Sequence, residues 1–323
     1  MTIFSFIGHL FLPGVLVYIT GNSRPRVLSV QLASGFDMPL MGLGLGHNKD
    51  DSEVERMVLE FLELGGRHID TAMSYDNQGA VGRAVKKSGI PREEIFITSK
   101  IPPERMGYES TFMAILEIAE EINLGYIDMV LIHWPSLLGV TIPCTTDDGS
   151  WQICRLGTWA AMEQMVQAGV VRSIGVSNFG TRHLEELRQF ASIWPPATNQ
   201  FEIHPMLPEN DLVRYCRDNG IVITAYGSLG GPQRAKEFTT SNVLRAVGAQ
   251  YNKAPAQVLL RWALQQQFVI IPMSRKRSRM IENLDVLDFT LSEEDYHLIS
   301  EFAASLGNYS RPYQQVADLN DFM

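Results

Sequence analysis

Apolar positions in this chain alternate between helical and strand-like spacing. The first clear helical pattern, Ser52–Leu64, repeats its apolar residues every three or four positions, at Val54, Met57, Val58, Phe61 and Leu62. Ser52 and Glu55 have the spacing of a capping box at its start, and Gly65 ends the pattern. The apolar stretch Arg67–Ala72 is too short for a helix and predicts a buried strand.

The same alternation continues along the chain and predicts the fold. The expected strands are the run ending at Leu45, Arg67–Ala72, Ile95–Ile101, Met129–Trp134, Val171–Ser177, Ala197–Ile203, Ile221–Tyr226 and Val269–Pro272. The expected helices are Ser52–Leu64, Gly79–Ser88, Ser110–Asn123, Thr158–Ala168, Arg182–Ala191, Asn210–Asn219, Pro255–Gln266, Ser278–Asp288 and Ser292–Ala303. This order predicts an α/β fold, a closed (β/α)8 TIM barrel with extra C-terminal helices. An open doubly wound sheet is the alternative, although no GxGxxG motif follows any strand.

The segments outside this alternation also carry expectations. The apolar runs Val27–Leu32 and Pro39–Leu45 are separated by a polar, glycine-containing stretch, which predicts an N-terminal β-hairpin. Three further segments are expected to be long loops, and such loops on a barrel usually cover its mouth: Pro135–Gly157, Gly227–Asn242 and the tail Leu306–Met323.

Residues 1–26 form an apolar N-terminal extension. Ile3–Thr20 is long enough to span a membrane, but no basic segment precedes it, and Arg24 and Arg26 follow it. A poorly ordered extension or a leader outside the fold is therefore favoured, while a membrane anchor or interfacial helix within residues 1–26 stays open. We expect residues 27–323 to form a single barrel domain.

Composition and charge restrict the classes of function. The 323 residues are 45% hydrophobic and 20% charged, as in ordinary globular proteins. A formal charge of −9 argues against a nucleic-acid partner. Cys144, Cys154 and Cys216 lack the spacing of a zinc site, and no metal is expected. Reduced thiols in a cytoplasmic protein are the simplest interpretation, and a Cys144–Cys154 disulfide stays open.

Polar residues end three successive predicted strands. Asp70 ends the second strand and Tyr75 follows it, Lys100 ends the third in IFITSKI, and His133 ends the fourth in MVLIHWP. A barrel would bring these side chains together at the carboxyl rim of its strands. Each alone has an ordinary structural interpretation: a helix cap, a solvated charge, a core histidine or a packed ring. Together they form an acid–base set.

This set suits the reduction of a carbonyl group. A carbonyl carbon that receives a hydride needs a proton for its oxygen, and the Tyr75 phenol can donate one. A free tyrosine has a pKa near 10, too high for an efficient acid at neutral pH, and a neighbouring ammonium such as that of Lys100 lowers it. Asp70 would hold the lysine charged, and His133 would orient the substrate oxygen by a hydrogen bond.

Several long motifs, in order along the chain, resemble the aldo-keto reductase family. They are GGRHIDTAMSYDNQGAVGRAV, IFITSKI, YIDMVLIHWP, VVRSIGVSNFG, ATNQFEIHPML, GIVITAYGSLG and IPMSRKRSRMIENL. The resemblance covers about Val27 to Ala303. It implies a (β/α)8 barrel that binds NADP(H) without a Rossmann motif and reduces aldehydes and ketones by hydride transfer.

The resemblance also implies roles for individual residues. Asp70, Tyr75, Lys100 and His133 match the catalytic tetrad, with Tyr75 as general acid. The cofactor would be held by Ser177, Asn178 and Gln200 at the carboxamide, Tyr226 against the nicotinamide ring, Ser228, Leu229 and Gly230 along its backbone, Ser274, Arg275, Lys276 and Arg279 at the 2′-phosphate, and Glu282 and Asn283 at the adenine. Trp134 and Trp151 are the candidates for substrate binding.

At several positions the chain departs from the family pattern. Met273 stands where many members have a phosphate-binding lysine, which weakens the expected preference for NADPH. Gly46 replaces an aromatic residue of the substrate pocket, and Leu45 replaces a threonine, so a reshaped pocket is expected. Gln78 replaces a common glutamate and Gly227 a common serine.

The favoured expectation is a cytoplasmic NADPH-dependent reductase of small carbonyls or open-chain sugars, present as a monomer or weak dimer. A cofactor-binding regulatory subunit with slow or no turnover is the alternative, and residues 1–26 could then place it at a membrane.

Overall fold

The computed structural model describes residues 27–46, 48–136, 144 and 150–309. The extension 1–26, with its membrane alternative, lies outside the described residues, as does most of the tail 306–323. Within the described part, no helix is long and apolar enough to cross a membrane.

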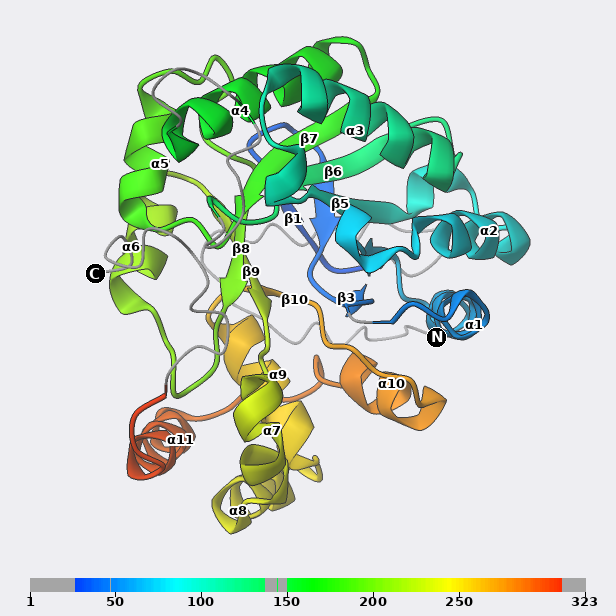
Figure 1. Ribbon diagram of the computed structural model, residues 1–323. Helices are drawn as coiled ribbons and strands as arrows, with labels where there is room; N and C mark the ends of the chain where they lie inside the picture. Colours follow the sequence, from blue (N-terminus) through cyan, green and yellow to red (C-terminus); the bar gives the residue numbers. More distant parts are fainter. Residues whose placement is uncertain (1–26, 47, 137–143, 145–149, 310–323) are drawn as a thin grey trace, which may run out of the picture.

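Eight parallel strands form the centre of the molecule, in the spatial order β3 to β10 (Figure 1). Their bounds are β3 Gly42–Gly44, β4 His68–Asp70, β5 Phe96–Ile101, β6 Ile127–Ile132, β7 Val171–Ser177, β8 Thr198–Glu202, β9 Val222–Tyr226 and β10 Val269–Ile270. A parallel bridge between Met41 and Ile270 brings the two edges of this sheet together. The backbone N–H of Ile270 donates to the Leu40 carbonyl at 2.9 Å. The predicted (β/α)8 barrel is confirmed.

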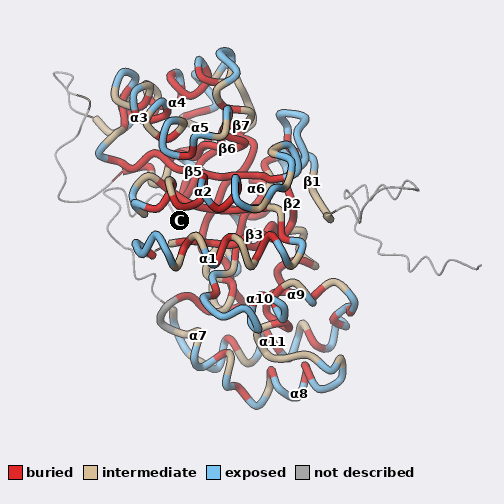
Figure 2. Tube along the Cα trace, turned by 90° about the vertical axis from the view of Figure 1, so that its right-hand side faces the viewer, coloured by how far each residue is buried: buried red, intermediate tan, exposed pale blue. Residues whose placement is uncertain are grey.

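Helices surround the strands, as the alternating pattern predicts. They are α1 Asp51–Glu63, α2 Gln78–Ser88, α3 Tyr108–Ile122, α4 Trp151–Gln167, α5 Thr181–Arg188, α6 Asn210–Asp218, α7 Gly231–Thr240, α8 Asn242–Tyr251, α9 Pro255–Gln265, α10 Arg277–Leu284 and α11 Glu293–Ser305. Buried residues concentrate in the strands, and exposed residues lie on the outer helices (Figure 2). The core is therefore a barrel filled by side chains and sealed by one face of each helix.

The hairpin at the start of the described chain is present, with a different second strand. β1 (Ser29–Gln31) pairs antiparallel with β2 (Asp37–Pro39). The single apolar run expected over Pro39–Leu45 is divided, because its first residue completes the hairpin and Gly42–Gly44 joins the barrel. The pattern of apolar residues alone does not show where one strand ends and the next begins.

Helix α1 begins differently from the capping box predicted at Ser52 and Glu55. Asp50 is the N-cap, and its carboxylate accepts from the backbone N–H groups of Ser52 and Glu53 at 3.0 and 3.1 Å. The helix therefore starts two residues earlier than expected, and the negative charge of Asp50 also suits a helix N-terminus.

The predicted loop Gly227–Asn242 is largely helical, which corrects that expectation. Helix α7 begins at Gly231 with a proline in its first turn, and Ser241 caps α8 by accepting from two backbone N–H groups. Adjacent glycines and a proline are typical of a turn, yet proline is also favoured in the first turn of a helix. The loop predicted over Pro135–Gly157 is also shorter than expected, because α4 begins at Trp151.

The cysteines divide into one pair and one free thiol. A disulfide joins Cys144 to Cys154 of α4, so the expectation of three reduced thiols was wrong for this pair. Cys216 is free and buried.

Candidate active site

A buried ion pair lies at the carboxyl ends of β4 and β5. The Lys100 ammonium donates to the Asp70 carboxylate at 2.6 Å and to the Thr71 carbonyl at 2.8 Å, and the Lys100 side chain is fully buried. The side-chain N–H of Gln200, from β8, donates to the other Asp70 oxygen at 2.8 Å. Burial lowers the pKa of Lys100, and the charge of Asp70 opposes this shift. Both oxygens of the Asp70 carboxylate thus accept a hydrogen bond, one from a residue of β5 and the other from a residue of β8.

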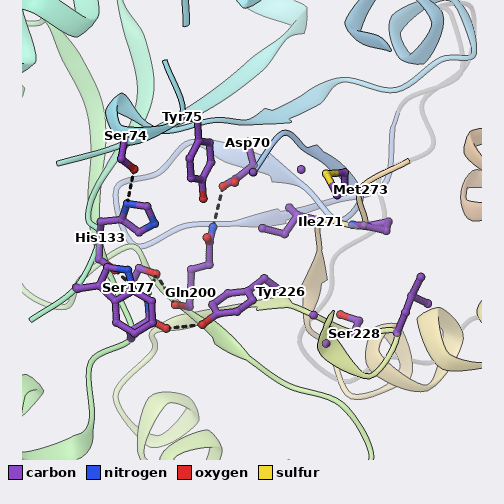
Figure 3. A pocket seen from close by; sticks show the side chains of 18 of the residues that line it. Asp70, Ser74, Tyr75, His133, Ser177, Gln200, Tyr226, Ser228, Ile271 and Met273 are labelled. Carbon is purple, nitrogen blue, oxygen red and sulfur yellow. Dashed lines mark hydrogen bonds between the residues drawn. The ribbon is translucent and has the colours of Figure 1, made fainter. Parts of the chain in front are cut away.

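Tyr75 lies directly above this pair. It ends the short helix η1 (Met73–Tyr75), and its ring centroid is 5.1 Å from the Lys100 ammonium nitrogen. The His133 ring meets the Tyr75 ring edge to face, with centroids 5.6 Å apart. Figure 3 shows the Tyr75 phenol pointing into the cavity between His133 and Asp70. The structure therefore brings the three strand-end residues Asp70, Lys100 and His133 together around the Tyr75 phenol.

His133 is held from two directions. Its Nδ1 lies 3.4 Å from the Ser74 hydroxyl, and its ring stacks on Trp134 with centroids 6.3 Å apart. The Asn178 side-chain N–H donates to the His133 carbonyl at 2.9 Å. These contacts leave the imidazole facing the Tyr75 side of the cavity.

A second polar group lies at the ends of β7, β8 and β9. The Ser177 hydroxyl donates to the Gln200 carbonyl at 2.8 Å, and the Tyr226 hydroxyl donates to the Asn178 side-chain oxygen at 2.8 Å (Figure 3). Asn178 has a φ of 60°, in the left-handed region that asparagine tolerates better than most residues. These hydrogen bonds thus fix three polar side chains, those of Ser177, Asn178 and Tyr226, along one wall.

The cavity encloses about 630 Å³, within the usual range for small-molecule sites. Its walls include Asp70, Tyr75, His133, Trp134, Ser177, Asn178, Gln200, Tyr226, Ser228 and Leu229, all singled out from the sequence. It also contacts Lys49, Ser74, Gly231 and Ile271, which the sequence reasoning did not select. Ser74 could have been found, because it precedes Tyr75 in the same motif.

One end of the cavity is a turn rich in glycine. Gly227, Ser228, Leu229 and Gly231 line it between β9 and α7, and Gly230 is the N-cap of that helix. The three glycines have φ values of 66°, 103° and 59°. The N–H groups of Gly230 and Gly231 donate within the turn to the Gly227 carbonyl at 2.9 and 2.8 Å. The glycines have no side chains, so a bound phosphate-containing backbone can approach the turn closely.

The basic segment predicted to hold a 2′-phosphate continues from the cavity wall. Ile271 and Met273 line the cavity, and the Ser274 hydroxyl accepts from the Lys276 backbone N–H at 3.2 Å where α10 begins. Arg275 pairs with Glu53 at 3.4 Å. Lys276 and Arg279 are exposed and form no ion pair among the described residues. Farther along α10, Glu282 is exposed and Asn283 is buried. Two basic side chains at a helix N-terminus suit an anionic group.

The two tryptophans predicted to bind substrate lie in different surroundings. Trp134 lines the cavity beside His133. Trp151 is the first residue of α4, is partly buried against the core, and is not among the described residues that line the cavity.

Two departures from the family pattern have a structural explanation. Gln78 is buried; its side-chain N–H donates to Glu121 at 2.7 Å, and its side-chain oxygen accepts from Ser99. A glutamate at this position would place two carboxylates against each other. Gly46 lies next to the Tyr75 phenol: a Cβ at position 46 would lie 3.7 Å from the Tyr75 hydroxyl oxygen, an ordinary van der Waals distance.

Comparisons with known proteins identify the family to which this chain is similar. The model of the aldo/keto reductase family matches residues 40–304. The chain is 40% identical to a glyoxal reductase of Bacillus subtilis over 83% of this chain and 90% of that protein. It is 38% identical to a 9,11-endoperoxide prostaglandin H2 reductase of Trypanosoma cruzi over 84% of this chain and 90% of that protein.

Solved structures show the same architecture. An aldo-keto reductase from a Medee basin deep-sea metagenome library superposes with a TM-score of 0.78 at 36% identity, covering 90% of this chain and 98% of that one. A Bombyx mori aldo-keto reductase in complex with NADP gives a TM-score of 0.76 at 31% identity, covering 86% of this chain and 94% of that one.

Proposed function

This chain belongs to the aldo-keto reductase family of oxidoreductases, and we propose that it reduces aldehydes or ketones to alcohols with NADPH. The single observation that carries the proposal is the contact between the buried Lys100–Asp70 pair and a phenol that faces the cavity. A cavity with a poised proton donor and an adjacent cation is what carbonyl reduction requires.

The proton for the product oxygen comes from Tyr75. The Lys100 ammonium, 5.1 Å from the ring centroid, stabilises the phenolate that remains after proton transfer. Asp70 keeps the ammonium in place, with Gln200 holding the second carboxylate oxygen. His133 borders the same space and orients the carbonyl oxygen toward the phenol. NADPH, when bound, supplies the hydride to the carbonyl carbon.

The residues present fit this cofactor. The Gln200 side-chain nitrogen is engaged by Asp70, so its oxygen can accept from the carboxamide of a nicotinamide. Ser177 and Asn178 lie beside it, and Tyr226 presents its ring to the cavity. The turn Ser228–Gly230 would follow the cofactor backbone. Ser274, Arg275, Lys276 and Arg279 would hold the 2′-phosphate, with Glu282 and Asn283 near the adenine.

The space over the phenol bears on the substrate. Gly46 carries no side chain where the cavity borders the Tyr75 hydroxyl, and Trp134 forms a wall on the side of His133. We therefore propose a small carbonyl compound whose larger substituent lies beside Gly46 and whose other side contacts Trp134. Open-chain sugars remain within this class.

The experiment is the substitution Tyr75→Phe, assayed with NADPH and 4-nitrobenzaldehyde. The variant is expected to lose turnover while it still binds NADPH, because only the acidic hydroxyl is removed. Turnover by the wild type near or above roughly 1 s⁻¹ would mark an ordinary enzyme. Wild-type protein that binds NADPH but turns over far more slowly would instead favour the regulatory subunit. Near-normal reduction by the variant would refute the assignment of the acid.

A further inference from the structure

A buried carboxylate that the proposed chemistry does not use lies beside the glycine turn. Glu202 ends β8 and is 1% exposed. One of its oxygens accepts from the Tyr309 hydroxyl at 2.6 Å. The other is buried and has no hydrogen-bond partner among the described residues. Burying a carboxylate is costly, and two neighbours approach its Oε1: the Tyr309 hydroxyl donates a hydrogen bond to it, and His204 Nε2 lies 3.7 Å away.

This pair packs directly against the turn that lines the cavity. A Cβ at Gly231 would collide with the Glu202 oxygen Oε1 and would lie 2.7 Å from the Tyr309 hydroxyl. A Cβ at Gly227 would lie 3.1 Å from Glu202 Cγ. The carboxylate and the phenol thus touch the outside of a turn whose inner side borders the cavity. A change in either side chain therefore alters the packing against the backbone of residues 227–231.

Tyr309 comes from the far end of the chain. It lies beyond α11, and in Figure 1 the red segment after that helix runs back toward the side of the barrel formed by β8 and β9. The Tyr309 ring also meets His204 edge to face, with centroids 4.6 Å apart. Through these contacts the C-terminal segment is fastened across the outside of the turn.

We propose that the Tyr309–Glu202 hydrogen bond is a latch that holds the turn Gly227–Gly231 in the conformation that binds the cofactor. Glu202 and Tyr309 are then positioning residues, because they act through the turn and touch no reacting atom. The inference rests on the proposed function in that the cavity takes NADPH. It adds that the C-terminal segment controls how long the cofactor stays bound.

The test compares Tyr309→Phe with Tyr296→Phe. The control removes a tyrosine hydroxyl from α11 whose hydrogen bond, 3.0 Å to the Trp262 carbonyl, does not involve the turn. NADPH dissociation is followed by stopped-flow tryptophan fluorescence, with Trp134 in the cavity as one reporter. Loss of a hydrogen bond to a charged group is expected to raise the Kd and the dissociation rate of NADPH about 10-fold in Tyr309→Phe. Tyr296→Phe should bind NADPH as the wild type does.

A second measurement is amide hydrogen exchange in the protein without NADPH. The latch predicts faster exchange in Tyr309→Phe confined to residues 227–231 and their immediate neighbours. Glu202→Gln keeps an acceptor for the phenol and should stay near the wild type, whereas Glu202→Leu should resemble Tyr309→Phe. Unchanged NADPH dissociation, or faster exchange throughout the barrel, would overturn the latch. If the wild type fails to bind NADPH, the proposed function fails, and the exchange result alone then decides the latch.

Discussion

Replacing Lys100 by methionine separates the electrostatic role of this residue from its structural role. The methionine has a similar length and no charge, so it removes the ammonium from beneath the Tyr75 ring. At 5.1 Å and an effective dielectric constant of about 20, a unit charge interacts with a phenolate by about 3 kcal/mol. A loss of this size in the transition state slows the chemical step by about two orders of magnitude.

The same substitution also leaves the buried Asp70 carboxylate without its cation. Removing one partner of a buried ion pair typically costs about 3–5 kcal/mol of stability. The double variant Lys100→Met with Asp70→Asn removes this unpaired charge and keeps a polar group that can still contact Gln200. It is therefore expected to recover much of the lost Tm without recovering the rate.

The assay is single-turnover oxidation of bound NADPH by 4-nitrobenzaldehyde, with thermal unfolding measured on the same samples. Single turnover reports the chemical step and is independent of cofactor release. The reasoning fails if the double variant regains wild-type rates, because the ammonium would then act only by holding Asp70. It also fails if Lys100→Met reduces NADPH binding as strongly as it reduces the rate.

Three further outcomes follow from the structure. Gln78→Glu should lower the free energy of unfolding by about 1–3 kcal/mol, because it places a buried carboxylate against the exposed carboxylate of Glu121. Urea unfolding should show this loss, and Glu121→Gln should reverse it. Gly46→Phe fills the space next to the Tyr75 hydroxyl, so kcat/KM for bulky ketones should fall at least about tenfold. The kcat/KM for a small aldehyde should change little. Equal losses for both substrates would contradict the proposed substrate orientation. Burial lowers the pKa of His68 to about 4, so this side chain stays neutral in the folded protein while the unfolded chain takes up a proton below about pH 6.5. The contribution of His68 to the free energy of unfolding is therefore complete above about pH 6.5 and falls by about 1.4 kcal/mol per pH unit down to about pH 4. Urea unfolding of the wild type and of His68→Gln should give stabilities that diverge over this pH range. Parallel stability curves would refute the assignment of a neutral, buried His68.

The sequence by itself determined the barrel and the neighbourhood of its mouth. Apolar periods of two kinds, repeated along the chain, require buried strands with helices packed over them, and the structure confirms this α/β barrel. Lys100 and His133 could be placed at one rim because parallel strands end on the same side. That argument needs only strand order, which local pattern supplies.

Other features depended on contacts between segments far apart in the chain. Glu202 and Tyr309 are 107 positions apart, and no local pattern predicts their hydrogen bond. Trp151 looked like a loop residue near the substrate but begins a helix that packs on the core. Helix α7 starts at Gly231, where the sequence suggests a turn, and the close approach of Glu202 leaves no room for a side chain at this position. Tertiary packing decided these points, because close approach across the barrel overrides local propensity.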